Sequence, residues 1–514
     1  MNLLLTTPLR AVPRFMSAND FPLVWGPTPP VTLPLLAAMA GPAWKVRLLD
    51  ALAAEPDLKD FGRWVAEADA MGITCSASSL SLNAEITLRL VRRLRPGIPV
   101  MLGGHHPSFY GPEWLERGAT VVVHGEGELT MAEVLERIEK KQGFSGVKGI
   151  SFLEDGKVVR NPDRELIPDL DSLPFPRWDL LDLSRYDQFT RSKGLAVSIE
   201  TSRGCTNSCS FCLASRMWNG TQRHQSIARA IADMKRLAAM GATQLSFAGD
   251  GFGNPPDYHL ELANEMVKAG IKMDWLSFMR VDSIVKEPRL PEAMARAGCK
   301  GVFIGFESPR QNLLDAWNKG PGGTADVSTY PEVYRMLDRE GIMVFGFLVA
   351  GHPDERLEEI PEIFRLHSKW CDLPLINVIQ PMKGTPDYDD YIRRGLLTKD
   401  MFYHDVRMPS LNVSQRNGPE IMRIFLMHIL FDYPRHIFSS KKTKRQFFRQ
   451  LYRFMAKELA AATFEGLKDY MKINFGKDTP AEKQDFFSGK YLSDEFLDAL
   501  AARAGVPASG KPVI

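Results

Sequence analysis

Three cysteines in one short stretch are the residues of this sequence best suited to chemistry. Cys205, Cys209 and Cys212 follow one another within eight residues, just after Glu200-Thr-Ser-Arg-Gly. Three thiolates at this spacing can hold three irons of a [4Fe–4S] cluster and leave the fourth iron open to a reactant. Zinc is the competing metal, but the nearest histidine, His224, lies beyond the loop, so a fourth ligand is missing. Ordinary core cysteines are the simplest alternative, and the clustering of half of the cysteines argues against it.

The other cysteines, Cys75, Cys299 and Cys371, are scattered along the chain. Six cysteines without a paired pattern do not form a disulfide framework, so we expect a reducing, cytoplasmic environment. No signal peptide is visible after Met1, and no uninterrupted apolar run approaches the ~20 residues of a membrane span.

The bulk composition is that of an ordinary globular protein. A length of 514 residues predicts two or three domains, and 44% apolar with 25% charged residues is typical of soluble chains. The formal net charge of +2 is too close to zero to favour nucleic acid as a partner.

The pattern of elements divides the chain into four parts. Residues 1–145 alternate short apolar strands with helical segments, which predicts a doubly wound, Rossmann-like α/β domain. Residues 146–190 break this rhythm with a hairpin turn at Asp155-Gly156 and a proline-punctuated linker. Residues 191–395 resume strand–helix units, with the cysteine loop after the first strand, which predicts a full or partial (β/α) barrel. Residues 396–514 are predicted to form a helical cap.

The strands expected in the first and third parts are short and mostly apolar, as in sheets covered on both faces. They are 2–6, 45–50, 72–76, 98–102, 120–123, 197–200, 244–247, 275–278, 302–306, 343–349 and 376–379.

The cysteine loop resembles that of the radical S-adenosylmethionine (radical SAM) superfamily. The hallmark of that family is CxxxCxxC with an aromatic residue, here Phe211, before the last cysteine. In the family, the methionyl amine and carboxylate of S-adenosylmethionine chelate the open iron. An electron from the cluster then cleaves the sulfonium to a 5′-deoxyadenosyl radical that abstracts hydrogen. The resemblance implies a [4Fe–4S] cluster, S-adenosylmethionine, and an external electron donor such as flavodoxin or ferredoxin.

The resemblance extends to segments that follow the later strands. Gly249 and Asp250 match the place where the family presents backbone to the methionyl amine. Arg280 and Asp282 match side chains that meet the methionine carboxylate or ribose, and Glu307, in Gly-Phe-Glu-Ser, lies near the adenine and ribose. Asp250 and Glu307 are equally well explained as ordinary polar residues at strand ends.

Two glycine-rich loops follow neighbouring strands in the first part, Gly103-Gly104-His105-His106-Pro107 and Gly125-Glu126-Gly127-Glu128. Glycines there let backbone approach a large flat ligand, although a simple turn is the default explanation. Together with the linker, these loops resemble the cobalamin-binding domain fused to many radical SAM enzymes, over roughly the first 140 residues.

This second resemblance implies a set of cobalamin contacts. Gly103, Gly104, His105 and Glu126 would meet the cofactor, with His106 also at the corrin edge, and Ser76 and Ser78 would bind its nucleotide tail; loop-capping serines are the simpler alternative. The DxHxxG motif is absent from the first 145 residues, so no histidine of that motif would bind cobalt.

These features favour methyl transfer to an unactivated carbon. Cobalamin would carry the methyl group, one S-adenosylmethionine would recharge it, and a second would supply the radical. The closest alternative is oxidative cyclisation or ring rearrangement without methyl transfer, as in the anaerobic magnesium-protoporphyrin ester cyclase. A methylthiotransferase would need three more N-terminal cysteines, and a non-enzymatic cobalamin sensor would have no use for the cysteine loop. The expected substrate is a small molecule or a lipid-like compound.

A basic and aromatic stretch lies in the C-terminal part. Eight basic and no acidic residues occur between Arg435 and Lys457, with five aromatic residues interleaved. A solvated helix face with aromatic anchors is the simpler explanation. The alternative is a surface for an anionic substrate or for peripheral contact with a membrane.

Overall fold

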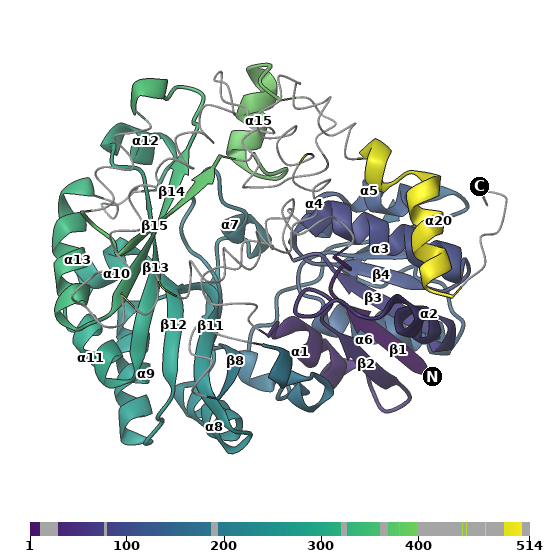
Figure 1. Ribbon diagram of the computed structural model, residues 1–514, viewed down its shortest axis with the longest axis horizontal. Helices are drawn as coiled ribbons and strands as arrows, with labels where there is room; N and C mark the ends of the chain where they lie inside the picture. Colours follow the sequence, from purple (N-terminus) through teal and green to yellow (C-terminus); the bar gives the residue numbers. More distant parts are fainter. Residues whose placement is uncertain are drawn as a thin grey trace.

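The structure, a computed structural model, describes residues 1–10, 29–76, 80–186, 194–319, 326–359, 369–379, 381–397 and 488–505, with single positions at 402, 445, 449 and 468. Figure 1 shows two α/β bodies side by side, one built from the N-terminal residues and one from the central residues. The yellow C-terminal helix lies on the N-terminal body.

A seven-stranded sheet forms the N-terminal body, in the order β2-β1-β3-β4-β5-β6-β7. The first five strands are parallel, and β6 and β7 join antiparallel at one edge. The order 2-1-3-4-5 is a doubly wound topology, as predicted. The strands are β1 (Asn2–Thr6), β2 (Lys45–Leu49), β3 (Ala70–Thr74), β4 (Val100–Gly103), β5 (Val121–Val123), β6 (Ile150–Glu154) and β7 (Lys157–Arg160).

Helices cover both faces of this sheet. Successive strand residues point to opposite sides, so a strand that is apolar at every position needs packing partners on both faces. Leu4 packs into one hydrophobic cluster, whereas its neighbours Leu3 and Leu5 pack into another. All three leucines are about 1% exposed, so the middle of β1 is apolar on both faces of the sheet. The helices are α1 (Thr32–Met39), α2 (Leu58–Glu67), α3 (Ser81–Leu94), α4 (His105–Phe109), α5 (Gly111–Glu116) and α6 (Glu128–Glu139).

A six-stranded parallel sheet forms the central body, in the order β15-β14-β13-β12-β11-β8. Consecutive strands are neighbours throughout, with helices between them on the outside, so the arrangement is an open, partial (β/α) barrel (Figure 1). The predicted fold class is confirmed. The strands are β8 (Leu195–Glu200), β11 (Ala242–Phe252), β12 (Asp274–Met279), β13 (Cys299–Glu307), β14 (Met343–Ala350) and β15 (Leu373–Val378).

The helices of the central body begin at recognisable signals. Ser226 Oγ accepts a hydrogen bond from Arg229 N at 3.1 Å and so caps α8 (Ile227–Ala239), and Gly241 follows the helix end, as expected. The other helices are α7 (Ala214–Met217), α9 (Pro256–Lys268), α10 (Val281–Lys286), α11 (Leu290–Arg296), α12 (Gln311–Ala316), α13 (Tyr330–Arg339) and α15 (Pro386–Arg393).

A small hairpin that the sequence did not predict lies in the cysteine loop. Its strands are β9 (Ser202–Gly204) and β10 (Gln222–His224), and they pair antiparallel. The hairpin brackets residues 205–221, which include all three clustered cysteines.

Three short 3-10 turns, Leu170–Ser172, Trp178–Leu180 and Leu183–Arg185, carry the chain between the two bodies. Within the predicted helical cap, residues 396–514, the described residues contain α20 (Asp494–Arg503). The basic stretch from Arg435 to Lys457 lies outside the described residues apart from Arg445 and Arg449. Within the described residues, no helix combines the length and the apolar character needed to cross a bilayer.

Candidate cofactor sites

The three clustered cysteines line one cavity of about 1290 Å³ at the carboxyl ends of the barrel strands. Arg280, which follows β12, and Glu307, which ends β13, line the same cavity. Parallel strands present their carboxyl ends at one edge, which is where this fold places its active sites. Five residues predicted from separate motifs are therefore brought together.

Hydrogen-bond donors point at the cysteine sulfurs. Asn207 Nδ2 lies 3.3 Å from Cys205 Sγ, and Arg280 Nη1 lies 3.9 Å from Cys209 Sγ. Burial raises the pKa of the Cys212 thiol to about 11, while the Ala214 N–H and the Lys319 charge act in the opposite direction. Three thiols with donors and cations around them match the demands of a thiolate-bound cluster, so the donor set fits an iron–sulfur centre.

Lys319 is a functional candidate that the sequence motifs did not identify. It lines the cysteine cavity, its side chain is 8% exposed, and its Nζ lies 2.6 Å from Glu307 Oε1. Glu307 has a φ of +61°, a conformation that costs a non-glycine residue free energy and that surrounding contacts must hold in place. The ion pair with Lys319 is such a contact.

Asp282 fixes the orientation of the Arg280 side chain. Arg280 Nε donates to Asp282 Oδ1 at 2.7 Å, and Nη2 donates to Lys319 O at 3.2 Å. Burial would lower the pKa of Arg280, but the charges of Asp282 and Cys209 outweigh it and raise that pKa. Asp282 thus orients Arg280, although Asp282 itself is not among the described residues that line the cavity.

Gly249 lies in β11, and its role toward S-adenosylmethionine stays a prediction. Its backbone lies against the cysteine loop, and a Cβ there would come within 2.9 Å of Ser202 O. Gly249 is not among the described residues that line the cysteine cavity. It serves the close approach of β11 to β9, and Asp250 lies next to it in the same strand.

A second cavity, of about 1040 Å³, lies over the carboxyl edge of the N-terminal sheet. Five predicted residues line it, namely Ser76, Gly103, Gly104, His105 and Glu126. Its floor is the sheet, with Gly72, Ile73 and Met101 exposed to it, and α1 supplies an apolar wall. A Cβ at Gly125 would meet nothing within 4 Å, so this loop leaves open space for a bulky group. The apolar floor and wall with a few polar groups are the lining that a large cofactor needs.

Gly104, His106 and Ser78 are also predicted to contact cobalamin. Gly104 lines the cavity with a φ of +111°, and a Cβ there would come within 2.5 Å of Cys75 O, so its lack of a side chain also permits close contact with the residue that follows β3. The expectation for His106 is wrong, because its ring is buried, stacks on Tyr110 at 4.2 Å and donates from Nε2 to Phe402 O at 2.8 Å. Ser78 lies outside the described residues.

One loop forms a wall of both cavities. Arg203, Met217 and Trp218 line the cavity over the N-terminal sheet, whereas Cys205 and Ala214 line the cysteine cavity. The two cavities are therefore separated by residues 203–218 of the cysteine loop.

Comparison with known families assigns both halves of the chain. The B12 binding domain matches residues 24–135, and the Radical SAM superfamily matches residues 199–367. The chain is a radical SAM enzyme with a B12-binding domain. Its cofactors are accordingly a [4Fe–4S] cluster, S-adenosylmethionine and cobalamin.

Two relatives of this radical SAM enzyme align with nearly three quarters of its length. An uncharacterized methyltransferase of Pyrococcus horikoshii is 27% identical over 377 residues, which cover 72% of this chain and 80% of the relative. The anaerobic magnesium-protoporphyrin IX monomethyl ester cyclase of Rubrivivax gelatinosus is 25% identical over 396 residues, covering 73% of this chain and 69% of the relative.

Among solved structures, the radical S-adenosylmethionine methyltransferase TsrM of Kitasatospora setae, with tryptophan and a SAM analog bound, has a TM-score of 0.61. It is 20% identical and covers 73% of this chain and 72% of that protein, so it supports the fold.

Proposed function

We propose that this radical SAM enzyme transfers a methyl group to an unactivated carbon of a small molecule. The observation that carries the proposal is that one loop, residues 203–218, walls both the cysteine cavity and the cobalamin-type cavity. When bound, cobalamin supplies a transferable methyl group, and the cluster with S-adenosylmethionine supplies a hydrogen-abstracting radical. The name of the Pyrococcus relative and that of TsrM favour the same reaction class.

The chain's own residues would bind the cofactors, orient them and exclude water from the site. Cys205, Cys209 and Cys212 would hold the cluster, with Arg280 and Lys319 placing positive charge beside it. Arg280, Lys319 and Glu307 would bind the polar groups of S-adenosylmethionine, with Asp282 orienting the arginine. Gly249 and Asp250, on the adjoining strand, would contribute through the backbone.

The apolar part of the cysteine cavity would shield a reactive intermediate. Phe278 and Phe303 line it with stacked rings, 5.0 Å apart at 25°, and Phe347 continues the surface at 6.0 Å from Phe278. Phe278 is 39% exposed although it lies on a barrel strand, which leaves an aromatic face free for a substrate. A dry, apolar surface protects a radical from side reactions.

For the N-terminal cavity, we propose that Gly103, Gly104, His105 and Glu126 surround the cobalamin, with Ser76 and Ser78 near the nucleotide tail. His105 lines the cavity, and a cobalt ligand from a DxHxxG motif is absent from the sequence there. The domain limits we propose are 1–145, 146–190, 191–395 and 396–514.

The test is transfer of an isotopic label. The reconstituted holoenzyme is incubated anaerobically with S-adenosylmethionine carrying a deuterated methyl group, a chemical reductant, and a small-molecule extract of cells lacking the gene. A product that gains one labelled methyl group supports the proposal. Formation of 5′-deoxyadenosine with an altered but unlabelled product would overturn it.

The second candidate function is oxidative cyclisation or ring rearrangement. It is favoured by the similarity to the magnesium-protoporphyrin ester cyclase, which spans 73% of this chain. The same experiment separates the two reactions, because cyclisation removes hydrogen from the substrate and adds no methylene unit.

Partners beyond the substrate are also part of the proposal. An external one-electron donor such as flavodoxin or ferredoxin would reduce the cluster in a reducing, cytoplasmic compartment, in keeping with six free cysteines. The basic stretch from Arg435 to Lys457 is proposed to recruit an anionic or membrane-resident substrate.

Changing Lys441, Lys442, Lys444 and Arg445 together to glutamine should therefore raise the apparent Michaelis constant and leave kcat unchanged. The difference should fade at high salt, because exposed charges are screened over about 8–10 Å at physiological ionic strength. Unchanged kinetics and no binding of wild-type protein to anionic liposomes would assign the stretch to a solvated surface.

A further inference from the structure

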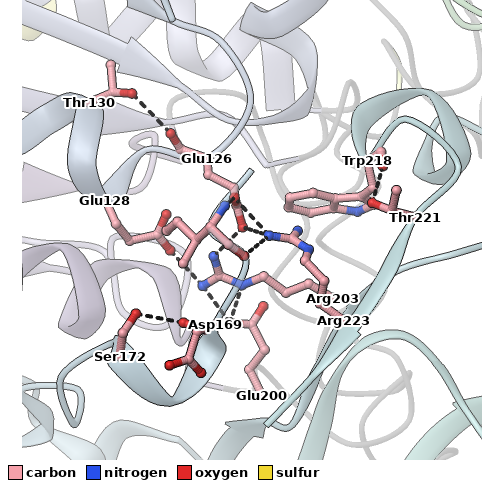
Figure 2. Close-up of polar contacts among 11 residues, drawn as sticks. Glu126, Glu128, Thr130, Asp169, Ser172, Glu200, Arg203, Trp218, Thr221 and Arg223 are labelled. Carbon is pink, nitrogen blue, oxygen red and sulfur yellow. Dashed lines mark hydrogen bonds and ion pairs between the residues drawn. The ribbon is translucent and has the colours of Figure 1, made fainter. Parts of the chain in front are cut away.

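Two arginines from the cysteine loop converge on acidic residues of the N-terminal domain. Arg203 and Arg223 face each other in the β9–β10 hairpin, so their side chains leave the same side of it. Two like charges at that spacing repel each other unless carboxylates lie between them. Figure 2 shows both guanidinium groups directed at Glu126, with Glu128 and Glu200 beside Arg203.

The bonds to Arg203 involve three carboxylates. Its Nη1 lies 2.8 Å from Glu126 Oε1, and its Nη2 lies 2.6 Å from Glu128 Oε1. Its Nε and Nη2 lie 2.9 Å and 2.7 Å from Glu200 Oε2. The side chain of Arg203 is 3% exposed and that of Glu126 is 4% exposed, so these charges depend on one another and not on water.

Arg223 and the linker complete the network. Arg223 Nη1 lies 3.0 Å from each oxygen of Glu126 and donates to Ile167 O at 2.6 Å. Ile167 N in turn donates to Glu126 at 2.6 Å. Burial would raise the pKa of Glu126, but the hydrogen bonds from both arginines and Ile167 lower it, which keeps the carboxylate charged. Three segments distant in sequence are thus joined at one carboxylate.

The network stands between the two cofactor cavities. Glu126, Glu128, Glu200 and Arg203 all line the cobalamin-type cavity. Two residues after Arg203, Cys205 lines the cysteine cavity. A shift of Arg203 would therefore move a cluster ligand relative to the wall of the other cavity.

Arginine is the residue that this position requires. Its planar fork offers five donors in fixed directions, and three of its nitrogens are used here by three different carboxylates. A lysine would keep the charge, but its single ammonium group cannot reproduce that geometry. The network is built for orientation and not for charge balance alone.

We propose that Arg203 is a positioning residue, which fixes the cluster loop at a set distance and orientation from the cobalamin-binding domain. Transfer between groups held by two domains demands such control, since a displacement of about 1 Å can lower a rate about 100-fold. This inference rests on the two cofactors and does not depend on which reaction they catalyse.

The test measures the separation of the two cofactors directly. Holoenzyme with cob(II)alamin and a reduced cluster is studied by pulsed electron paramagnetic resonance, which reports the dipolar coupling between the two centres. Wild type is compared with Arg203→Met and Arg203→Lys, after iron and cobalt contents have been matched. We expect Arg203→Met to broaden and shift the coupling, and Arg203→Lys to restore part of the wild-type signal.

Arg229→Met is the matched control. Arg229 is a part-buried arginine of the same domain that bonds Asp233 at 2.8 Å and the linker carbonyls of Asp171 and Leu173, but it lines neither cofactor cavity. The control should lower the melting temperature and leave the coupling unchanged. If Arg203→Met also lowers only the melting temperature, the positioning role is overturned.

A milder variant covers the case in which Arg203→Met does not fold or does not load. Glu128→Gln weakens one of the bonds to Arg203 and leaves those to Glu126 and Glu200 in place. It should broaden the coupling to a smaller extent, and a wild-type coupling would overturn the proposal. Because no substrate is present, failure of methyl transfer would leave these results unaffected.

Discussion

Cys212 is a proposed iron ligand in a buried environment. Its burial raises the thiol pKa to about 11, so at neutral pH the thiol keeps its proton until a metal displaces it. Cys299 is also buried and also has a raised pKa, yet it sits in the hydrophobic core, away from the cysteine cavity. Unlike Cys299, Cys212 shares its cavity with the cationic side chains of Arg280 and Lys319.

Replacing Cys205, Cys209 and Cys212 together by alanine should abolish the cluster. Anaerobically reconstituted wild type should show the oxygen-sensitive absorbance of one [4Fe–4S] centre and matching iron, whereas the triple variant should show neither, because no thiolate ligand remains in the cavity. Cys299→Ala serves as the control and should keep the full iron content. Normal absorbance in the triple variant would refute the assignment.

Lys319 should contribute directly to binding of S-adenosylmethionine. It is a buried cation in the cysteine cavity whose one described partner group is Glu307. Lys319→Met should weaken S-adenosylmethionine binding about tenfold or more, the value of a hydrogen bond to a charged group, in anaerobic calorimetry of cluster-loaded protein.

Two controls separate this effect from damage to the site. Lys286→Met removes a lysine that pairs with Asp282 at 3.2 Å but is 52% exposed, and it should leave affinity unchanged. Lys319→Met alone leaves the Glu307 carboxylate without its ion-pair partner, and the double variant Lys319→Met/Glu307→Gln removes that negative charge. Wild-type affinity in Lys319→Met would show that the lysine serves only Glu307.

Among the secondary-structure elements, the sheets could be predicted because strands such as β1, β3 and β5 are short, mostly apolar and buried. β1 runs from Asn2 to Thr6 as expected, and the remaining predicted strands agree with the structure to within a few residues at either end. The β9–β10 hairpin was missed because its strands are three residues long and polar, Ser-Arg-Gly and Gln-Arg-His, with no alternation to detect. Its stability comes from Glu126, about 77 residues earlier, which local sequence cannot indicate.

The glycine loops of the N-terminal domain illustrate a similar limit. Sequence indicated that Gly104 and Gly125 belong to one site, and both line one cavity. It could not indicate that a side chain at Gly104 would strike the backbone at Cys75, whereas one at Gly125 would meet open space. The direction of a missing Cβ depends on tertiary packing and not on the motif.

Gly125→Val should therefore reduce cobalamin content while leaving the cluster intact. The added side chain enters space with no protein atom within 4 Å of its Cβ, at a residue that lines the cavity. Valine is also strained at the φ of +69°, so a strain control is needed. Gly146→Val provides it, since Gly146 has a φ of +83°, is equally open and lines neither cavity.

Cobalt content after purification from a cobalamin-replete host is the measurement. Wild type and Gly146→Val should contain cobalamin in roughly stoichiometric amount, and Gly125→Val should contain little. Equal cobalt in all three proteins would contradict the placement of cobalamin in this cavity.

In the whole molecule, helix α20 from the C-terminal part lies on the N-terminal domain. α20 packs beside α2 and α3, as Figure 1 shows, with Leu497 fully buried and Arg93 bonded to Asp494 and Asp498. Phe402 contacts the same domain from a second point, 3.9 Å from the Arg117 guanidinium. Sequence predicted a helical cap after residue 396 but gave no partner for it, because an amphipathic helix does not encode which surface it covers.

Loosening α20 should therefore weaken the cobalamin-binding domain, although Asp494 on α20 lies 401 residues after its partner Arg93. Leu497→Ala should lower the free energy of unfolding of that domain by about 2–4 kcal/mol, because it removes a buried side chain and leaves a cavity. Asp494→Asn is the control, since Asp494 lies on the same helix with a side chain that is 75% exposed, and surface ion pairs contribute about 0–1 kcal/mol. Melting of the cobalamin-loaded protein, followed by release of the cofactor's visible absorbance, should shift to lower temperature in Leu497→Ala and stay near the wild-type value in Asp494→Asn. Cobalamin release at the wild-type temperature in Leu497→Ala would show that the domain folds independently of α20.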